Sequence, residues 1–123
     1  MTVGETFRIA IIDEDPAGLS LAIGLKRKGF QNLIIYEREK VRHQGWSISL
    51  FSPNGGLAFI EYLGLLPELS AISFQPSFRA LDGETGKTLL YKAGNENGRR
   101  FKRGDLRDAV YQVCLTEGTS FIF

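Results

Sequence analysis

Three carboxylates in a row directly follow an apolar run near the start of the chain. Ile9–Ile12 is followed by Asp13, Glu14 and Asp15, and Gly18 lies three positions further on. Paired carboxylates can act as general acid and base, and their oxygens suit hard cations. An apolar strand, a turn and a helix also form the frame of a dinucleotide-binding unit, in which positions 13 and 15 would be glycines. The turn therefore has the frame of a phosphate site but carries acids.

The charge of this turn opposes an anionic ligand. A carboxylate about 4 Å from a phosphate is repelled by roughly 1 kcal/mol in water and about 4 kcal/mol at an effective dielectric of 20. A helix N-terminus attracts an anion by only about 0.3–1 kcal/mol at the surface. Two interpretations stay open. The acids satisfy the free N–H groups of the helix in place of an anion, or they form an acidic pocket for a cation or for acid–base chemistry. We favour the first.

The elements around the turn predict a βαβ unit. Phe7–Ile12 has the pattern of a short, fully buried strand. Asp15 suits the N-cap and Pro16 the first turn of a helix, which we expect to end at Gly29 after three cationic residues. Leu33–Tyr36 is a second expected buried strand. A strand, a helix and a strand within about 30 residues predict a parallel pair.

The rest of the chain predicts an α/β fold, with a parallel sheet and a β-hairpin. We expect one more helix with Leu106, Ala109, Val110 and Val113 on one face. The other expected elements are a short extended piece at 47–50, a helix at 55–63, hairpin strands at 77–81 and 87–92, a polar connection at 93–100 and a final buried strand at 119–123.

Composition bounds the class of protein. A chain of 123 residues that is 43% hydrophobic can form one globular domain, and the formal net charge of +1 indicates neither a nucleic-acid nor a membrane partner. The start "MTVGETF" has no secretory pattern, and no apolar run approaches the roughly 20 residues that span a bilayer. Cys114 is the single cysteine, so an intramolecular disulfide and a cysteine-based metal site are excluded. We expect no metal site and a soluble, cytoplasmic protein.

Three segments, in order along the chain, resemble the N-terminal portion of FAD-dependent monooxygenases of the aromatic-hydroxylase type. They are "RIAIIDEDPAGLSLAIGLKRKGF", "LIIYEREKVRHQGWSISLFSPNGGLAFIEYLGLLPEL" and "RFKRGDLRDAVYQV". The resemblance implies a partial, Rossmann-like FAD-binding domain that spans residues 1–123 as a single truncated unit. The hairpin at 77–92 resembles the start of that family's substrate-domain sheet.

The resemblance also implies which residues would face the cofactor. Glu37 matches the acid that hydrogen-bonds the adenosine ribose, and it lies 19 residues after Gly18. Gly18 matches the third fingerprint glycine, which lets helix and strand pack closely. Arg38 and Arg42 match basic positions near the adenine and the flavin, and Arg103 matches an arginine that contacts FAD.

Glu37 and Arg103 also have a purely structural interpretation. Glu37 is equally compatible with a solvated acid at a strand end. The arginines of the last expected helix, Arg103 and Arg107, have acidic neighbours in Asp105 and Asp108 with which they would pair.

Two departures from the family change the expected function. Asp13 and Asp15 replace the fingerprint glycines, so we expect FAD binding to be severely weakened and no cofactor to be bound. If the family's function is retained instead, the cofactor is FAD. The family's chain also continues beyond the strand at 119–123. A parallel sheet with open edges and bare faces invites pairing, so we expect a homodimer or a complementing chain.

The sequence leaves several functions open. The leading one is a truncated, degenerate relative of flavin monooxygenases that does not hydroxylate alone. Such a protein would bind a small hydrophobic molecule or catalyse a non-redox cyclisation or isomerisation, with Asp13, Asp15, Glu37 and Arg103 as catalytic groups. A second is an FAD-binding component that needs a partner chain. A third is a receiver-like signalling domain with an acidic pocket, although "SISLFSPNGG" lacks the aspartate that such a domain needs.

Overall fold

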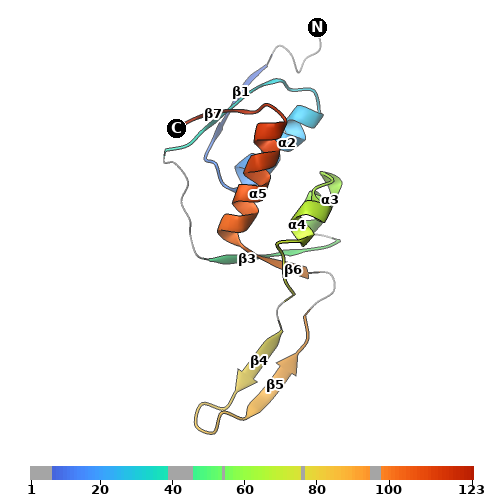
Figure 1. The fold of residues 1–123 in the computed structure, drawn as a ribbon, viewed down its shortest axis with the longest axis vertical. Coiled ribbons are helices and arrows are strands. Elements are labelled where there is room, and N and C mark those ends of the chain that lie inside the picture. Colours follow the sequence, from blue (N-terminus) through green and yellow to red (C-terminus); the bar gives the residue numbers. More distant parts are fainter. Residues whose placement is uncertain (1–6, 39–45, 54, 76, 95–97) are drawn as a thin grey trace. The chain divides into compact units, whose positions relative to one another are not determined.

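The chain folds into two compact units. The computed structural model describes residues 7–38, 46–53, 55–75, 77–94 and 98–123. The first unit comprises Met1–Trp46 and Arg103–Phe123, and the second comprises Ser47–Lys102 (Figure 1). The turn and the sheet that position the candidate site belong to the first unit. The expectation of a single domain over residues 1–123 stays a prediction.

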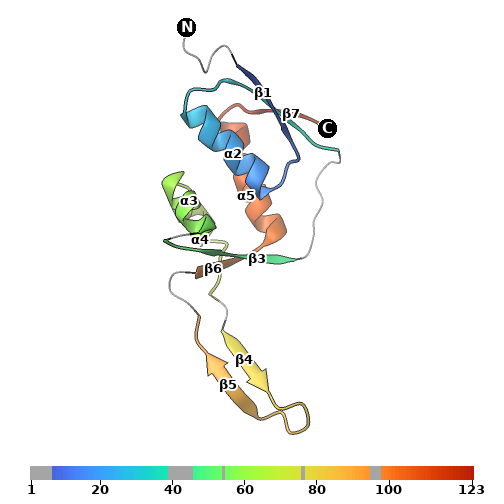
Figure 2. The same ribbon diagram turned by 180° about the vertical axis from the view of Figure 1, so that it is seen from behind.

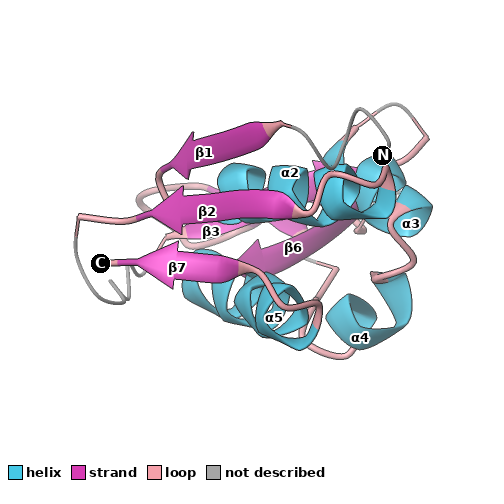
Figure 3. Ribbon diagram, turned by 90° about the horizontal axis from the view of Figure 1, so that it is seen from above, coloured by secondary structure: helices cyan, strands magenta, loops and turns pink. Residues whose placement is uncertain are grey.

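The first unit is built on a three-stranded parallel sheet in the order β1-β2-β7, as Figure 3 shows. Its strands are β1 (Arg8–Ile12), β2 (Asn32–Tyr36) and β7 (Ser120–Ile122). Ile11 pairs with Ile35, which in turn pairs with Phe121. The β1-α2-β2 unit confirms the predicted parallel pair, and the mixed α/β class is confirmed as well.

Helix α2 (Pro16–Arg27) begins and ends where local signals predict. Asp15 is its N-cap and Pro16 lies in its first turn, where the missing N–H of proline costs nothing. Lys26 and Arg27 lie in the last turn, where cations complement the helix dipole. Gly29 follows with a φ of +98°, a conformation that glycine adopts without a steric penalty.

Helices α2 and α5 (Arg103–Thr116) lie on the same side of the sheet and contact each other (Figures 1 and 2). The buried face of α5 contains Leu106, Arg107, Val110 and Cys114, and so includes a charged residue absent from the predicted apolar face. The core between these helices and the sheet includes Ile11, Leu19, Ala22, Ile23, Leu33, Ile35, Leu106, Val110 and Cys114.

The expectation that the strands are fully buried is wrong. Ile11, Leu33 and Ile35 are buried beneath the helices, but the residues that alternate with them are exposed or, for Ile34, half-exposed. Ile12 is 75% exposed and Ile122 is 48% exposed. Alternate residues of a strand point to opposite faces, and the described part of this unit supplies helices to one face only.

The second unit contains two antiparallel pairs and two short helices. Strands β4 (Phe78–Leu81) and β5 (Thr88–Lys92) form the predicted hairpin. The polar connection expected at 93–100 is wrong in part, because Gly98–Lys102 forms strand β6 against β3 (Ser47–Phe51). Phe101 on β6 is fully buried, which anchors this otherwise polar strand. The helices are α3 (Gly56–Tyr62) and α4 (Leu66–Ser70), of which α4 was not predicted.

The topology does not fit the receiver-like alternative. A doubly wound receiver fold needs parallel strands throughout, whereas β3 and β6 pair antiparallel, as do β4 and β5. Within the described ranges, every helix is too short or too polar to cross a bilayer.

Candidate functional site

The backbone of the acidic turn follows the path of a glycine turn. Asp13 has a φ of +91°, which a residue with a side chain rarely adopts. Its N–H donates to the carbonyl oxygen of Tyr36 at 2.9 Å, so the turn is held against the end of β2. The Asp13 side chain itself is exposed. The turn therefore has a conformation that suits glycine while carrying a carboxylate.

Asp15 places its carboxylate at the N-terminus of α2. Its Oδ1 accepts a hydrogen bond from the backbone N–H of Gly18 at 2.8 Å. This N–H belongs to the first turn of the helix, where a phosphate oxygen would otherwise accept. Among the three turn acids, Asp15 performs the capping role predicted for them.

Gly18 lies where the chain approaches itself closely. A Cβ atom at this position would lie 2.4 Å from the carbonyl oxygen of Asp13 and 3.3 Å from a methyl group of Ile11. No side chain fits there without moving backbone. The structure thus gives the reason for glycine at this position, which is the close packing of helix and strand that the fingerprint implies.

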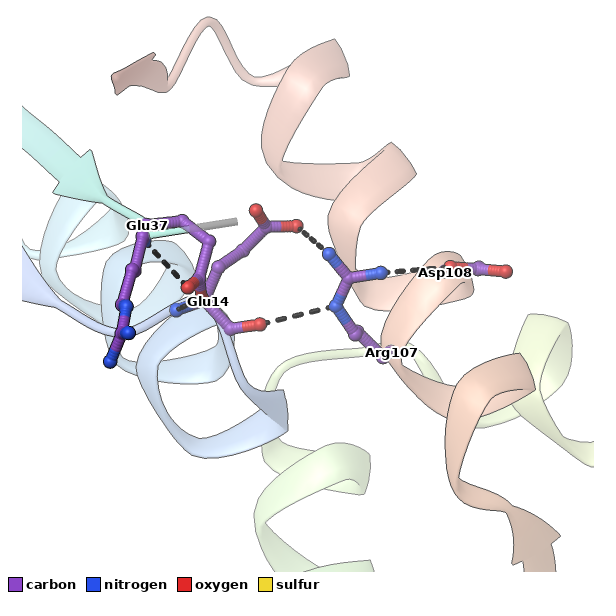
Figure 4. A network of polar contacts seen from close by, with 5 residues as sticks. Glu14, Glu37, Arg107 and Asp108 are labelled. Carbon is purple, nitrogen blue, oxygen red and sulfur yellow. Dashed lines mark hydrogen bonds and ion pairs between the residues drawn. The ribbon is translucent and has the colours of Figure 1, made fainter. Parts of the chain in front are cut away.

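Glu14 points away from the helix N-terminus and into the core, where it meets α5 (Figure 4). Its side chain is fully buried, and Oε1 lies 2.6 Å from Nη2 of Arg107. Arg107 also donates from Nε to the carbonyl oxygen of Glu14 at 3.2 Å, and its Nη1 lies 3.4 Å from Asp108. Two bonds from one guanidinium therefore tie the turn to α5. The expectation that Glu14 helps to cap the helix is wrong.

Glu37 completes the network from the end of β2 (Figure 4). Its Oε2 accepts from the backbone N–H of Glu14 at 2.9 Å, and its Oε1 accepts from the N–H of Arg38 at 2.7 Å. The carboxylate is half-buried and fixed against the turn. It is not a fully solvated strand-end acid.

The surroundings of Glu14 shift its titration. Burial raises the pKa of Glu14, while the Arg107 guanidinium lowers it and the Glu37 and Asp108 carboxylates raise it further. The net shift is upward. Oε2 of Glu14 is buried and has no hydrogen-bond partner among the described residues, which is consistent with burial as the dominant cause.

The structure brings four of the predicted site residues together at the acidic turn. Asp13 and Asp15 lie on the turn between β1 and α2, Gly18 lies in the first turn of α2, and Glu37 contacts the turn from the end of β2. Arg38 follows Glu37 and is exposed. Arg103 is exposed at the start of α5, where its backbone N–H donates to the Trp46 carbonyl oxygen at 2.8 Å. Arg42 lies outside the described residues. The cofactor and catalytic roles of all these residues stay predictions.

Sequence reasoning missed Arg107 as the residue that contacts the turn. It foresaw the contact with Asp108 but not the pair with Glu14, which lies 93 residues away. One signal was available, because Arg107, Val110 and Cys114 share the i, i+3, i+7 spacing of a single helix face. An arginine in such a row predicts a buried cation with a partner on another element. In the described ranges, no group of three or more His, Cys, Asp or Glu could hold a metal ion.

Comparison with known proteins connects this fold to flavin enzymes. The tetrameric form of 2-methyl-3-hydroxypyridine-5-carboxylic acid oxygenase matches with a TM-score of 0.77 and 25% identity, over 96% of this chain and 32% of that one. The tetracycline destructase Tet(55) matches with a TM-score of 0.73 and 23% identity, over 98% of this chain and 30% of that one. No protein-family model and no curated protein matches the chain.

A third solved structure extends the same pattern at lower identity. The p-nitrophenol 4-monooxygenase from Pseudomonas putida DLL-E4 matches with a TM-score of 0.75 and 15% identity, over 93% of this chain and 30% of that one. These neighbours are FAD-dependent monooxygenases of the aromatic-hydroxylase type, so the resemblance seen in the sequence is confirmed. The chain spans about a third of the length of the solved structures that it matches.

Proposed function

We propose that this chain, which has the fold of part of the flavin-dependent aromatic hydroxylases, works without FAD because its own carboxylates occupy the nucleotide turn. One contact carries the proposal. Asp15 Oδ1 accepts the Gly18 N–H at 2.8 Å, at the helix end where a pyrophosphate would accept. A helix end that is capped internally has lost the free donor and much of the positive potential that draws an anion.

The residues around that contact fit a pyrophosphate poorly. Asp13 exposes a carboxylate on the same turn, and Glu37 places a second one within hydrogen-bond distance of the Glu14 N–H. Arg107, which reaches the turn from α5, is committed to buried Glu14 rather than to a ligand. Each additional carboxylate near a phosphate opposes binding by roughly 1–4 kcal/mol, depending on the local dielectric. The arrangement supports a protein that has exchanged its anionic ligand for an internal network.

The chemistry left to such a turn is binding or proton transfer. Asp13 is exposed, and Asp15 and Glu37 are half-buried, so a small molecule in solution could reach these three carboxylates. A cyclisation or isomerisation needs only proton donation and abstraction, which carboxylates supply without a redox group. We therefore propose a cofactor-free, non-redox role over hydroxylation.

A titration with FAD tests this proposal. We expect no saturable change in flavin fluorescence with the wild-type chain. The Asp13→Gly/Asp15→Gly variant should gain saturable binding because it removes both carboxylates and restores the glycines. Asp82→Asn/Glu84→Gln, in the exposed turn of the β4–β5 hairpin, removes the same formal charge elsewhere and should not bind. Micromolar or tighter binding by the wild type would overturn the proposal.

A second candidate function is an FAD-binding component that needs a partner chain. The exposure of both Arg38 and Arg103 favours it, since neither cation is buried in the core. This candidate requires that the wild type binds FAD when a partner chain supplies the part of the flavin-enzyme fold that lies outside the matched region. The same titration, repeated with that part added, separates the two functions.

A further inference from the structure

The guanidinium of Arg107 lies between two carboxylates that differ in burial (Figure 4). Its Nη2 lies 2.6 Å from Oε1 of Glu14, whose side chain is 0% exposed. Its Nη1 lies 3.4 Å from Oδ1 of Asp108, whose side chain is 46% exposed. The cation therefore has a short contact with a buried acid and a longer contact with an acid that water reaches. Only the arginine side chain has to shift for the second contact to replace the first.

The buried carboxylate is only partly satisfied by this contact. Oε1 of Glu14 bonds to Arg107, while Oε2 is buried and has no hydrogen-bond partner among the described residues. An ionised oxygen that has lost its water and found no donor favours the neutral form of the carboxyl group. Burial accordingly raises the pKa of Glu14, and the attraction of Arg107 offsets this only in part. The ion pair thus depends on a carboxyl group that takes up a proton more readily than an ordinary glutamate.

The charged and titratable groups around Glu14 come from three elements. They are Asp13 and Asp15 on its own turn, Glu37 at the end of β2, and Arg107, Asp108 and Cys114 on α5. Within this described set, Arg107 opposes the protonation of Glu14, whereas the carboxylates of Glu37 and Asp108 favour it. Cys114 stays neutral where Glu14 titrates, because burial and nearby carboxylates raise the pKa of its thiol to about 12. The balance at Glu14 therefore lies between one cation and its neighbouring acids.

The acidic turn has separate attachments to α5 and to β2. Arg107 supplies the first, from Nη2 to the Glu14 carboxylate and from Nε to the Glu14 carbonyl oxygen at 3.2 Å. In the second, the N–H of Asp13 donates to the Tyr36 carbonyl oxygen and the N–H of Glu14 donates to Glu37 Oε2, both at 2.9 Å. Of these two described attachments, the first alone uses the charge of Glu14. Loss of that charge therefore frees the turn from α5 and leaves it on β2.

We propose that Glu14, Arg107 and Asp108 form a pH-dependent latch between the acidic turn and α5. When Glu14 is ionised, its carboxylate holds the guanidinium against the turn, and the latch is closed. When Glu14 binds a proton from the solvent, its charge is lost, the guanidinium moves to the exposed carboxylate of Asp108, and the latch is open. The latch goes beyond the proposed function, because it operates whether or not the turn binds a ligand.

Hydrogen exchange followed by NMR over a pH series tests the latch, and it needs no flavin. The probes are the Nε–H of Arg107, which the closed latch protects, and the backbone N–H of Asp13, which reports the attachment to β2. As the pH falls through a single step centred above 4.5, the ordinary pKa of glutamate, the protection factor of the Arg107 N–H should fall by about tenfold or more. The protection factor of Asp13 should stay constant. A parallel loss at Asp13, or constant protection of Arg107 until the whole chain unfolds, would overturn the proposal.

Variants of the two carboxyl groups distinguish the latch from a purely structural ion pair. Glu14→Gln removes the charge at nearly constant shape, so the Arg107 N–H should be weakly protected at every pH, with no step. Asp108→Asn removes the carboxylate that receives the guanidinium and that favours protonation of Glu14, so the step should move to lower pH. It changes a half-exposed side chain, so the test remains decisive even if Glu14→Gln does not fold.

Asp105→Asn is the matched control for Asp108→Asn. Asp105 is an exposed acid on the same helix and is not among the groups that shift the pKa of Glu14. The step in this variant should therefore coincide with that of the wild type. The proposal is overturned if the step persists in Glu14→Gln, or if Asp108→Asn leaves the step where Asp105→Asn does.

Discussion

Glu14 and Arg107 form a buried ion pair that joins the β1–α2 turn to helix α5, with 2.6 Å between Glu14 Oε1 and Arg107 Nη2. Their side chains are 0% and 10% exposed. The guanidinium also donates to the Glu14 carbonyl oxygen, so one residue holds both the side chain and the backbone of the turn. The position of the turn therefore depends on a contact between segments far apart in the sequence.

Removal of the Arg107 guanidinium should destabilise the folded chain. Arg107→Met keeps much of the aliphatic volume but leaves the Glu14 carboxylate buried without its partner. We expect the free energy of unfolding to fall by about 3–5 kcal/mol, as for other broken buried pairs. Urea denaturation measures it. Asp108→Asn is the control, since Asp108 is 46% exposed and lies 3.4 Å from Arg107, and it should cost at most about 1 kcal/mol. A similarly small loss for Arg107→Met would contradict the role given to this pair.

The raised pKa of Glu14 predicts a pH dependence of stability. Between the ordinary value of 4.5 and the raised value in the folded state, the folded chain binds more protons than the unfolded chain. The contribution of Glu14 to stability must therefore decrease as the pH rises through this window. Glu14→Gln should remove this decrease in the free energy of unfolding with rising pH, as measured by urea denaturation at a series of pH values. An unchanged slope in the variant would assign the effect to another group.

Asp82 predicts a second dependence of stability on pH, which lies at lower pH and runs in the opposite direction. Hydrogen bonds from the backbone N–H groups of Thr85 and Glu84 hold the pKa of Asp82 below its ordinary value of 3.8. Its contribution to stability is present above that value and is lost as the pH falls through the lowered pKa. Asp82→Asn should abolish this loss without changing the window that belongs to Glu14.

Much of the fold follows from local signals in the sequence. The N-cap at Asp15 and the terminating Gly29 delimit α2, because both act through hydrogen bonds and dihedral angles of a few neighbouring residues. Strand β6 was missed because Arg99 and Arg100 dominate its pattern, and only its pairing with β3 makes it a strand. The ion pair of Glu14 and Arg107 was missed for the same kind of reason. The helical spacing of Arg107 marks it as buried, but it does not identify the distant residue with which it pairs.

Gly18 should tolerate no side chain. In Gly18→Ala the new Cβ would lie 2.4 Å from the Asp13 carbonyl oxygen, so the turn or the helix must shift. We expect a large fall in the midpoint of thermal unfolding. Gly83→Ala is the matched control, since nothing lies within 4 Å of a Cβ at that position, and its midpoint should stay near that of the wild type. Equal effects of the two substitutions would contradict the close approach at Gly18.

Cys114 should be chemically inert in the folded chain. Burial and, to a smaller extent, the Glu117 and Glu14 carboxylates raise the pKa of its thiol to about 12, and Sγ lies 3.4 Å from the Leu19 carbonyl oxygen. The reactive thiolate is therefore scarce at neutral pH. A maleimide reagent should label the chain only as fast as the core opens, and labelling should become immediate in denaturant. Rapid labelling of the native chain would show that α5 is not packed as described.

The positive φ of Asp13 has an evolutionary consequence. Aspartate and glycine codons differ only in their second base, so one base change at each of two codons would give glycine at positions 13 and 15. The backbone would not have to change its path, because Asp13 already adopts a φ of +91°. The acidic turn and a glycine turn therefore differ by one base change in each of two codons and share the same backbone path. Selection for or against a bound anion could convert one into the other without rebuilding the fold.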